Sequence, residues 1–157
     1  MQLERLKEEI QIEIENLNAL VGETEKFLRE VETRKPTTIE IIGAGGIVNG
    51  FYGGVENLLK RFLKYWQIPL PSGGQWHSDM LDIFKNAAGS GLPLKFDDLT
   101  LRKLNEFRRI RHVVRNHYPH LLRWDLLAPH LQSLTTVYQS IEKSVQAAIA
   151  DLNKNRL

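Results

Sequence analysis

The sequence predicts an all-α fold, a bundle of four main helices plus a short one. Apolar residues recur every three or four positions over several long segments, the spacing expected for one face of an α-helix. Prolines and glycines gather between these segments, where they end helices and form loops. The 157 residues are enough to bury a core and most simply form one domain. We therefore expect a single helical bundle over residues 1–157 without internal repeats.

The first predicted helix is long and amphipathic. Its apolar stripe begins at Leu3, and we expect the helix to continue to about Arg34. Lys35-Pro36 should end it, because the residue before a proline disfavours the helical region. Thr38 is the expected N-cap of a second helix that ends near Tyr65.

The remaining elements follow from the same signals of apolar spacing and helix breakers. In chain order we expect a loop at 67–74, a short helix at 76–87, a second loop through Gly89, Gly91 and Pro93, a fourth helix capped by Asp97 or Asp98 and ending near Pro119, and a fifth helix at about 126–152.

A glycine-rich segment, residues 39–46, superficially resembles the strand and glycine loop of a dinucleotide site. The match fails at the third glycine position, where Val48 stands, and neither a second strand nor a suitably spaced acidic residue follows. We interpret the glycines as helical positions that let another helix approach closely. The expected contact positions are Gly43, Gly46 or Gly50, and Gly53 or Gly54.

Composition narrows the functional classes. The absence of cysteine removes disulfides and thiolate metal sites and is compatible with a reducing cytosol. The charged N-terminus lacks the apolar core of a secretory signal, and the longest uncharged stretch, 41–55, is shorter than the roughly 20 residues that span a bilayer. No histidine pair has zincin spacing with a Glu. We expect a cytoplasmic protein without membrane contact, metal or cofactor.

The most informative segment is 107–118, which concentrates arginines, histidines and a tyrosine. Residues 102–123 carry seven Lys or Arg against one Glu, whereas residues 1–35 carry nine Glu against six Lys or Arg. This asymmetry indicates an anionic partner for the basic helix. On a helical wheel the polar face is suited to phosphate, and we expect it to be exposed. It holds Arg108, Arg111, His112, Arg115 and Tyr118, whereas His117 and Leu121 fall on the apolar side.

Four polar or aromatic residues outside this helix are expected to have structural roles. Glu56 lies on a largely apolar helix and should form an ion pair with Arg115 or Arg111 across the bundle. Trp76-His77 should anchor a loop against the bundle, and Tyr52 should belong to the core.

Three segments together resemble the HepT-like branch of the HEPN superfamily: residues 49–56 (NGFYGGVE), 71–81 (PSGGQWHSDML) and 108–118 (RRIRHVVRNHY). The resemblance covers 38–152, with 1–35 as a long N-terminal helix. It implies a HEPN-type helical bundle that forms a two-fold homodimer. In active members it implies a metal-independent endoribonuclease toxin paired with a minimal nucleotidyltransferase antitoxin, which can silence the toxin by adenylylating a tyrosine near the catalytic motif.

The family's catalytic pattern is an arginine, four to six residues, then a histidine, often followed two residues later by a tyrosine. Here Arg111 fits the arginine and Tyr118 the tyrosine, but Asn116 replaces the histidine two positions before the tyrosine. Asparagine cannot shuttle a proton near neutral pH. Either His112 supplies the proton transfer, or His117 does so from a distorted helix end, or the nuclease activity is lost.

The helical wheel and the resemblance together predict a set of site residues on the basic helix. Arg111, His112 and Arg115 are the predicted catalytic residues, with Asn116 and His117 in the same region. Arg108, Arg111 and Arg115 are predicted to bind RNA phosphates, and Tyr118 is the modification candidate. The alternative is a non-catalytic HEPN module, antitoxin-like or binding RNA or a partner protein through the same face.

Overall fold

The computed structural model describes residues 2–85 and 92–155, and it confirms the all-α fold. Within these residues the only β-type pairing is an isolated bridge between Lys85 and Phe96. In chain order the helices are α1 (Gln2–Glu30), α2 (Thr38–Tyr65), α3 (Trp76–Ile83), α4 (Asp98–Asn116), the 3₁₀ helix η1 (Pro119–Leu121) and α5 (Trp124–Lys154).

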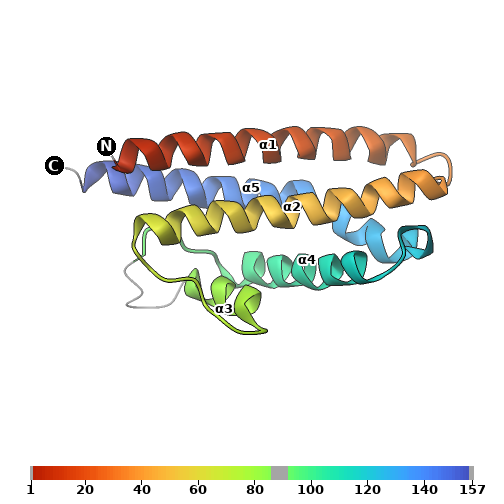
Figure 1. The fold of residues 1–157 in the computed structure, drawn as a ribbon. Helices are drawn as coiled ribbons and strands as arrows, with labels where there is room; N and C mark the ends of the chain where they lie inside the picture. Colours follow the sequence, from red (N-terminus) through yellow and green to blue (C-terminus); the bar gives the residue numbers. More distant parts are fainter. Residues whose placement is uncertain (1, 86–91, 156–157) are drawn as a thin grey trace.

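Helix α2 is the centre of the bundle, because α1, α4, α5 and η1 all pack against it. In Figure 1 it lies between α1 and α4, and the short α3 lies beside α4. Its inward face carries large side chains without exposed surface, among them Phe51, whose ring centre is 4.9 Å from that of Phe107 on α4. This packing holds α4 against the bundle and leaves its polar face free for a site.

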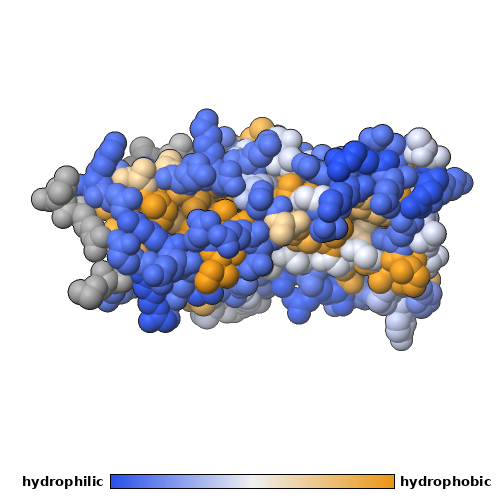
Figure 2. All heavy atoms as spheres, turned by 90° about the horizontal axis from the view of Figure 1, so that it is seen from above, coloured by the Kyte–Doolittle hydropathy of each residue, from blue (hydrophilic) through white to orange (hydrophobic). Residues whose placement is uncertain are grey.

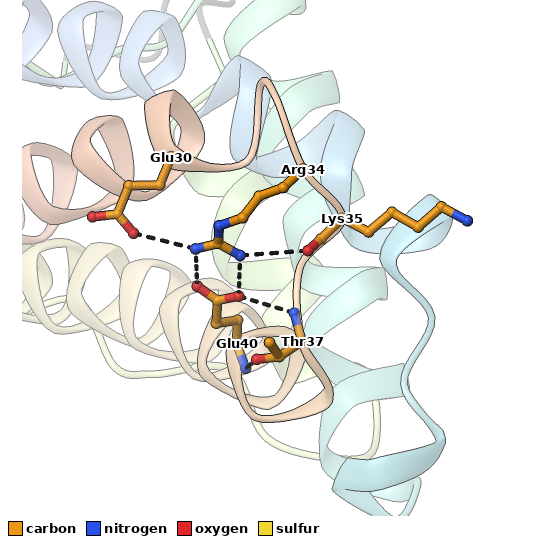
Figure 3. Close-up of polar contacts among 5 residues, drawn as sticks. All are labelled: Glu30, Arg34, Lys35, Thr37 and Glu40. Atoms are coloured by element: carbon orange, nitrogen blue, oxygen red, sulfur yellow. Dashed lines mark hydrogen bonds and ion pairs between the residues drawn. The ribbon is translucent and has the colours of Figure 1, made fainter.

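The corner between α1 and α2 lies a few residues from its predicted place. Helix α1 ends at Glu30 rather than near Arg34, and Thr37 rather than Thr38 caps α2. The Thr37 hydroxyl accepts from the Glu40 amide at 3.2 Å, and the Glu40 carboxylate accepts from the Thr37 amide at 2.9 Å. Arg34 leaves the helix and forms a two-point pair with Glu40 at 2.7 and 2.8 Å, and it also approaches Glu30 (Figure 3). The capping box and this ion pair therefore set the boundary.

Helix α3 is shorter than predicted. It ends at Ile83, because the Phe84 carbonyl accepts a hydrogen bond from the Phe96 amide at 2.8 Å and both rings enter the core. The expected end of this helix at Ala87, and the loop positions Gly89 and Gly91, lie outside the described residues.

The last two helices begin close to their predicted starts. Asp97 is the N-cap of α4, and its carboxylate accepts from the Thr100 amide at 2.8 Å. Helix α4 ends at Asn116, three residues before Pro119. Helix α5 begins at Trp124, two residues earlier than expected.

The glycines of α2 allow close contacts, but not at every predicted position. A Cβ atom at Gly54 would lie 2.7 Å from Leu17 of α1, which confirms the prediction there. Gly43 faces open space, so the prediction there is wrong. Of the alternatives Gly46 and Gly50, Gly46 faces open space, whereas a Cβ atom at Gly50 would lie 3.7 Å from Leu20 of α1. The other close approach is at Gly45, where a Cβ atom would lie 2.8 Å from a leucine methyl carbon of the chain after η1. The contacts therefore follow the faces that α2 buries.

The outer face above α1 is mainly hydrophilic, with separate hydrophobic patches (Figure 2). Among the described helices, none has the combination of length and apolar character that a membrane span requires.

Candidate functional site

A groove of about 710 Å³ lies between α4 and the segment that leads into α3, with α2 at its floor. No Asp or Glu lines it, whereas four arginines do, so it is suited to an anion. The lining residues are Arg108, Arg109, Arg111, His112, Arg115 and Asn116 of α4, Gly74, Gln75, His77 and Ser78, and Tyr52 of α2.

Arg111 is the arginine held most firmly. Its Nη1 donates to Glu56 Oε1 at 2.7 Å, and its Nε donates to Asn49 Oδ1 at 3.0 Å. The side chain is only 16% exposed, so the expectation that Arg111 is exposed is wrong, because the buried carboxylate draws it to the floor of the groove. Of the two partners predicted for Glu56, the structure has Arg111 and not Arg115.

Glu56 joins three helices at this point. Its residue is 3% exposed, and its second carboxylate oxygen contacts Nδ1 of His77 at the start of α3. Both oxygens are therefore engaged, as a buried carboxylate requires. His77 contacts Glu56 of α2 and so has the structural role expected of it, and it also lines the groove. A buried glutamate at position 56 indicates a second partner besides arginine, because one arginine bond leaves the other carboxylate oxygen without a hydrogen bond.

Tyr52 combines the core role expected from sequence with a place at the floor of the groove. The Arg111 guanidinium lies over its ring, 5.5 Å from the ring centre. Burial raises the pKa of the Tyr52 hydroxyl above its ordinary value, and the negative charge of Glu56 adds to the rise. The hydroxyl therefore keeps its proton and serves as a hydrogen-bond donor.

The other arginines of the groove are available to a ligand. Within the described residues, Arg108, Arg109 and Arg115 form no ion pair, and Arg108 donates only to Asn105, at 3.2 Å. Arg109 was not among the predicted site residues, although it belongs to the same run of arginines. These three guanidinium groups thus offer hydrogen-bond donors to a ligand around Arg111, which Glu56 holds in place.

The end of α4 places the histidines differently from the helical wheel. His112 is exposed and lines the groove, and Asn116 Nδ2 donates to the His112 carbonyl at 2.7 Å. His117 was expected to face the core, but it is exposed and extended, with φ −119° and ψ 152°. The wheel assumes a continuous helix, and the helix has already ended at Asn116. His117 Nδ1 lies 2.8 Å from the Val113 carbonyl, and His117 is not among the groove-lining residues.

Tyr118 also lies outside the helix. It precedes η1 in extended conformation, is 73% exposed, and does not line the groove, so the wheel was wrong to place it beside Arg111. Leu121, expected toward the core, is 59% exposed for the same reason. His120 was not among the predicted site residues, although it follows Arg115 after four residues and so repeats the family's Arg-to-His spacing. His120 lies in η1, with its ring centre 5.9 Å from that of Tyr118.

Over residues 2–85 and 92–155, no group of three or more His, Asp or Glu side chains is arranged to hold a metal ion. The polar side-chain groups that line the groove are guanidinium, imidazole, amide and hydroxyl groups.

A family model described as "HepT-like protein" matches residues 44–152, which confirms the resemblance seen in the sequence. The matched segment contains α4, α3 and most of α2, and therefore every residue that lines the groove. No curated protein and no solved structure matches the chain.

Proposed function

This chain belongs to the HepT-like family of HEPN proteins, and from that premise we propose that it is a metal-independent endoribonuclease, the toxin of a toxin–antitoxin pair. One observation carries the proposal: a groove of about 710 Å³ that contains four arginines, an exposed histidine and no carboxylate among its lining residues. The positive charge of such a groove attracts the phosphodiester backbone of RNA. Its hydrogen-bond donors can stabilise the negative charge that develops on the phosphate oxygens when the backbone is cleaved.

In the proposed reaction the RNA 2′-hydroxyl attacks the adjacent phosphorus, and the 5′-oxygen leaves and takes a proton from water. The products are a 2′,3′-cyclic phosphate and a 5′-hydroxyl end. Two imidazoles line the groove, those of His77 and His112. His77 is engaged by Glu56 whereas His112 is exposed, so His112 is the proposed acceptor of the 2′-hydroxyl proton. Arg115 and Arg108 bind the phosphate, and Arg111 stabilises the phosphorane oxygens through Nη2, which forms no hydrogen bond within the described residues.

The proposal includes a cytoplasmic homodimer in which two grooves face each other across a two-fold axis. It also includes a minimal nucleotidyltransferase antitoxin that adenylylates Tyr118. The exposure of Tyr118, at 73%, supports this modification because a second enzyme has to reach the hydroxyl. Light scattering should give twice the 18.1 kDa chain mass. Co-expression with the nucleotidyltransferase should add AMP to the wild type but not to Tyr118→Phe.

The decisive experiment is cleavage of RNA by the purified protein in excess EDTA. We expect 2′,3′-cyclic phosphate ends from RNA and no cleavage of 2′-O-methyl RNA. Arg115→Ala should abolish cleavage, whereas Arg102→Ala should cleave normally, because Arg102 is an exposed arginine of α4 outside the groove. His112→Gln should be inactive. If His117→Gln or His120→Gln is inactive instead while His112→Gln cleaves, the proposed proton acceptor is wrong.

A non-catalytic RNA-binding or antitoxin-like module is the second candidate, and one observation favours it. Asn116 stands where the family pattern has histidine, and its amide donates to the His112 carbonyl rather than offering a group that titrates. Under this alternative the wild type binds RNA through the same arginines, and no RNA is cut at any enzyme concentration. An Asn116→His variant that gains cleavage would then identify this position as the cause.

A further inference from the structure

The Tyr52 hydroxyl is a buried donor without a partner. Tyr52 has no exposed surface, and within the described residues its hydroxyl forms no hydrogen bond. Leaving such a group unsatisfied is unfavourable, and most buried polar groups in folded proteins do have partners. A phenylalanine would fill the same space without this cost. The hydroxyl therefore calls for an explanation that the core role of the ring does not supply.

The surroundings of the hydroxyl restrict what its partner can be. The nearby charged groups are Glu56, Arg108 and Arg111, since these shift the Tyr52 pKa by their charges. The arginines are donors only, so neither can accept the hydroxyl proton. Both oxygens of Glu56 are already engaged, one by Arg111 and the other by His77. No group within the described residues accepts from the hydroxyl, so its acceptor comes from outside the chain, either a water molecule or a ligand in the groove that Tyr52 lines.

We propose that Tyr52 is a further phosphate-binding residue, whose hydroxyl donates a hydrogen bond to a phosphodiester oxygen of RNA bound at the floor of the groove beside Arg108 and Arg111. This inference rests on the proposed function and assigns one of its ligand contacts. The pairing is favourable because a phosphate oxygen is a charged acceptor, and hydrogen bonds to charged groups are the stronger ones. Because burial keeps the hydroxyl protonated, the donor is present at all pH values near neutrality.

The test is Tyr52→Phe, which removes only the hydroxyl. The probe is a short fluorescein-labelled 2′-O-methyl RNA, which carries the phosphodiester backbone but cannot be cleaved, and binding is followed by fluorescence anisotropy. We expect Tyr52→Phe to bind about tenfold more weakly than wild type, the loss typical of one hydrogen bond to a charged group. Its melting temperature should equal or exceed that of the wild type, because no hydrogen bond inside the protein is lost.

Tyr138→Phe is the matched control. Tyr138 is also a buried tyrosine, but its hydroxyl donates to Glu142 at 2.6 Å, and it lies outside the groove. This variant should melt at a lower temperature and bind the oligonucleotide as the wild type does. The two variants thus distinguish a tyrosine hydroxyl that binds a ligand from one that stabilises the fold.

The outcomes distinguish this inference from the proposed function. If wild type binds and Tyr52→Phe binds equally well, the inference is overturned and the proposed function stands. If Tyr52→Phe melts at a lower temperature, the hydroxyl has a partner inside the protein and the inference is again overturned. If the wild type does not bind the oligonucleotide, both fail. If the wild type binds, Tyr52→Phe binds tenfold more weakly and RNA is never cut, the inference holds and the ribonuclease proposal fails.

Discussion

Replacing Glu56 with glutamine should destabilise the protein more than any comparable change at an exposed carboxylate. Glu56→Gln keeps the volume of the side chain and removes its charge. The carboxylate is 3% exposed and engages Arg111 and His77, so the variant leaves a guanidinium that is only 16% exposed without its counter-ion. Because Arg111 cannot lose its proton, it has to be desolvated unpaired or move outward.

The expected cost follows from this burial. Breaking a buried ion pair by removing one partner costs about 3–5 kcal/mol, and the glutamine carbonyl retains one acceptor, so we expect about 3 kcal/mol. For a protein of this size each kcal/mol lowers the melting temperature by about 2–4 °C, which gives a decrease of about 6–12 °C. Glu23→Gln should change the free energy of unfolding by less than about 0.5 kcal/mol, because Glu23 pairs with Lys26 on the surface and both side chains are at least 65% exposed.

The assay is urea unfolding followed by helical circular dichroism at one fixed protein concentration, since dimerisation would make stability depend on concentration. A double-mutant cycle with Arg111→Met isolates the pairwise free energy of Arg111 and Glu56. If Glu56→Gln unfolds at the same urea concentration as Glu23→Gln, the buried ion pair does not organise the floor of the groove. Arg111 would then not depend on Glu56 for its place at the floor of the groove.

Three further predictions test the fold. Gly53→Ala should raise the free energy of unfolding by about 0.5–1 kcal/mol, because alanine favours the helix and its Cβ atom meets open space. Gly54→Ala should lose that gain, because its Cβ atom would lie 2.7 Å from a leucine methyl carbon of α1. Equal melting temperatures of the two variants would contradict this prediction. Arg34 and a backbone amide lower the pKa of Glu40 from 4.5 to about 2, so its contribution is present above pH 4.5 and is lost as the pH falls toward 2. Glu40→Gln should therefore melt below wild type at neutral pH, and the difference should vanish near pH 2; a constant difference would count against the ion pair. Asp97→Ala should lower the free energy of unfolding, measured in urea, by about 1 kcal/mol, because it removes the N-cap of α4. An unchanged free energy of unfolding would mean that α4 does not need this cap.

The helices and one face of the site could be predicted from the sequence alone. Helical spacing and helix breakers are local signals, so they located the five α-helices to within a few residues at most boundaries. The same periodicity placed Arg108, Arg111, His112 and Arg115 on one face of α4, and all four line the groove. This succeeded because neighbouring turns of one continuous helix have a fixed geometry.

The partners of that face depend on how the helices pack, which the sequence does not show. Asn49 and Glu56 hold Arg111 from 62 and 55 residues away in the chain, and His77 enters from a third helix. No local pattern encodes such meetings, because they depend on which faces of α2, α3 and α4 bury each other. The wheel also failed at His117, where the chain leaves the helix before the proline and turns the imidazole outward. A helix end is set by competition between local propensity and packing, and packing is a property of the whole bundle.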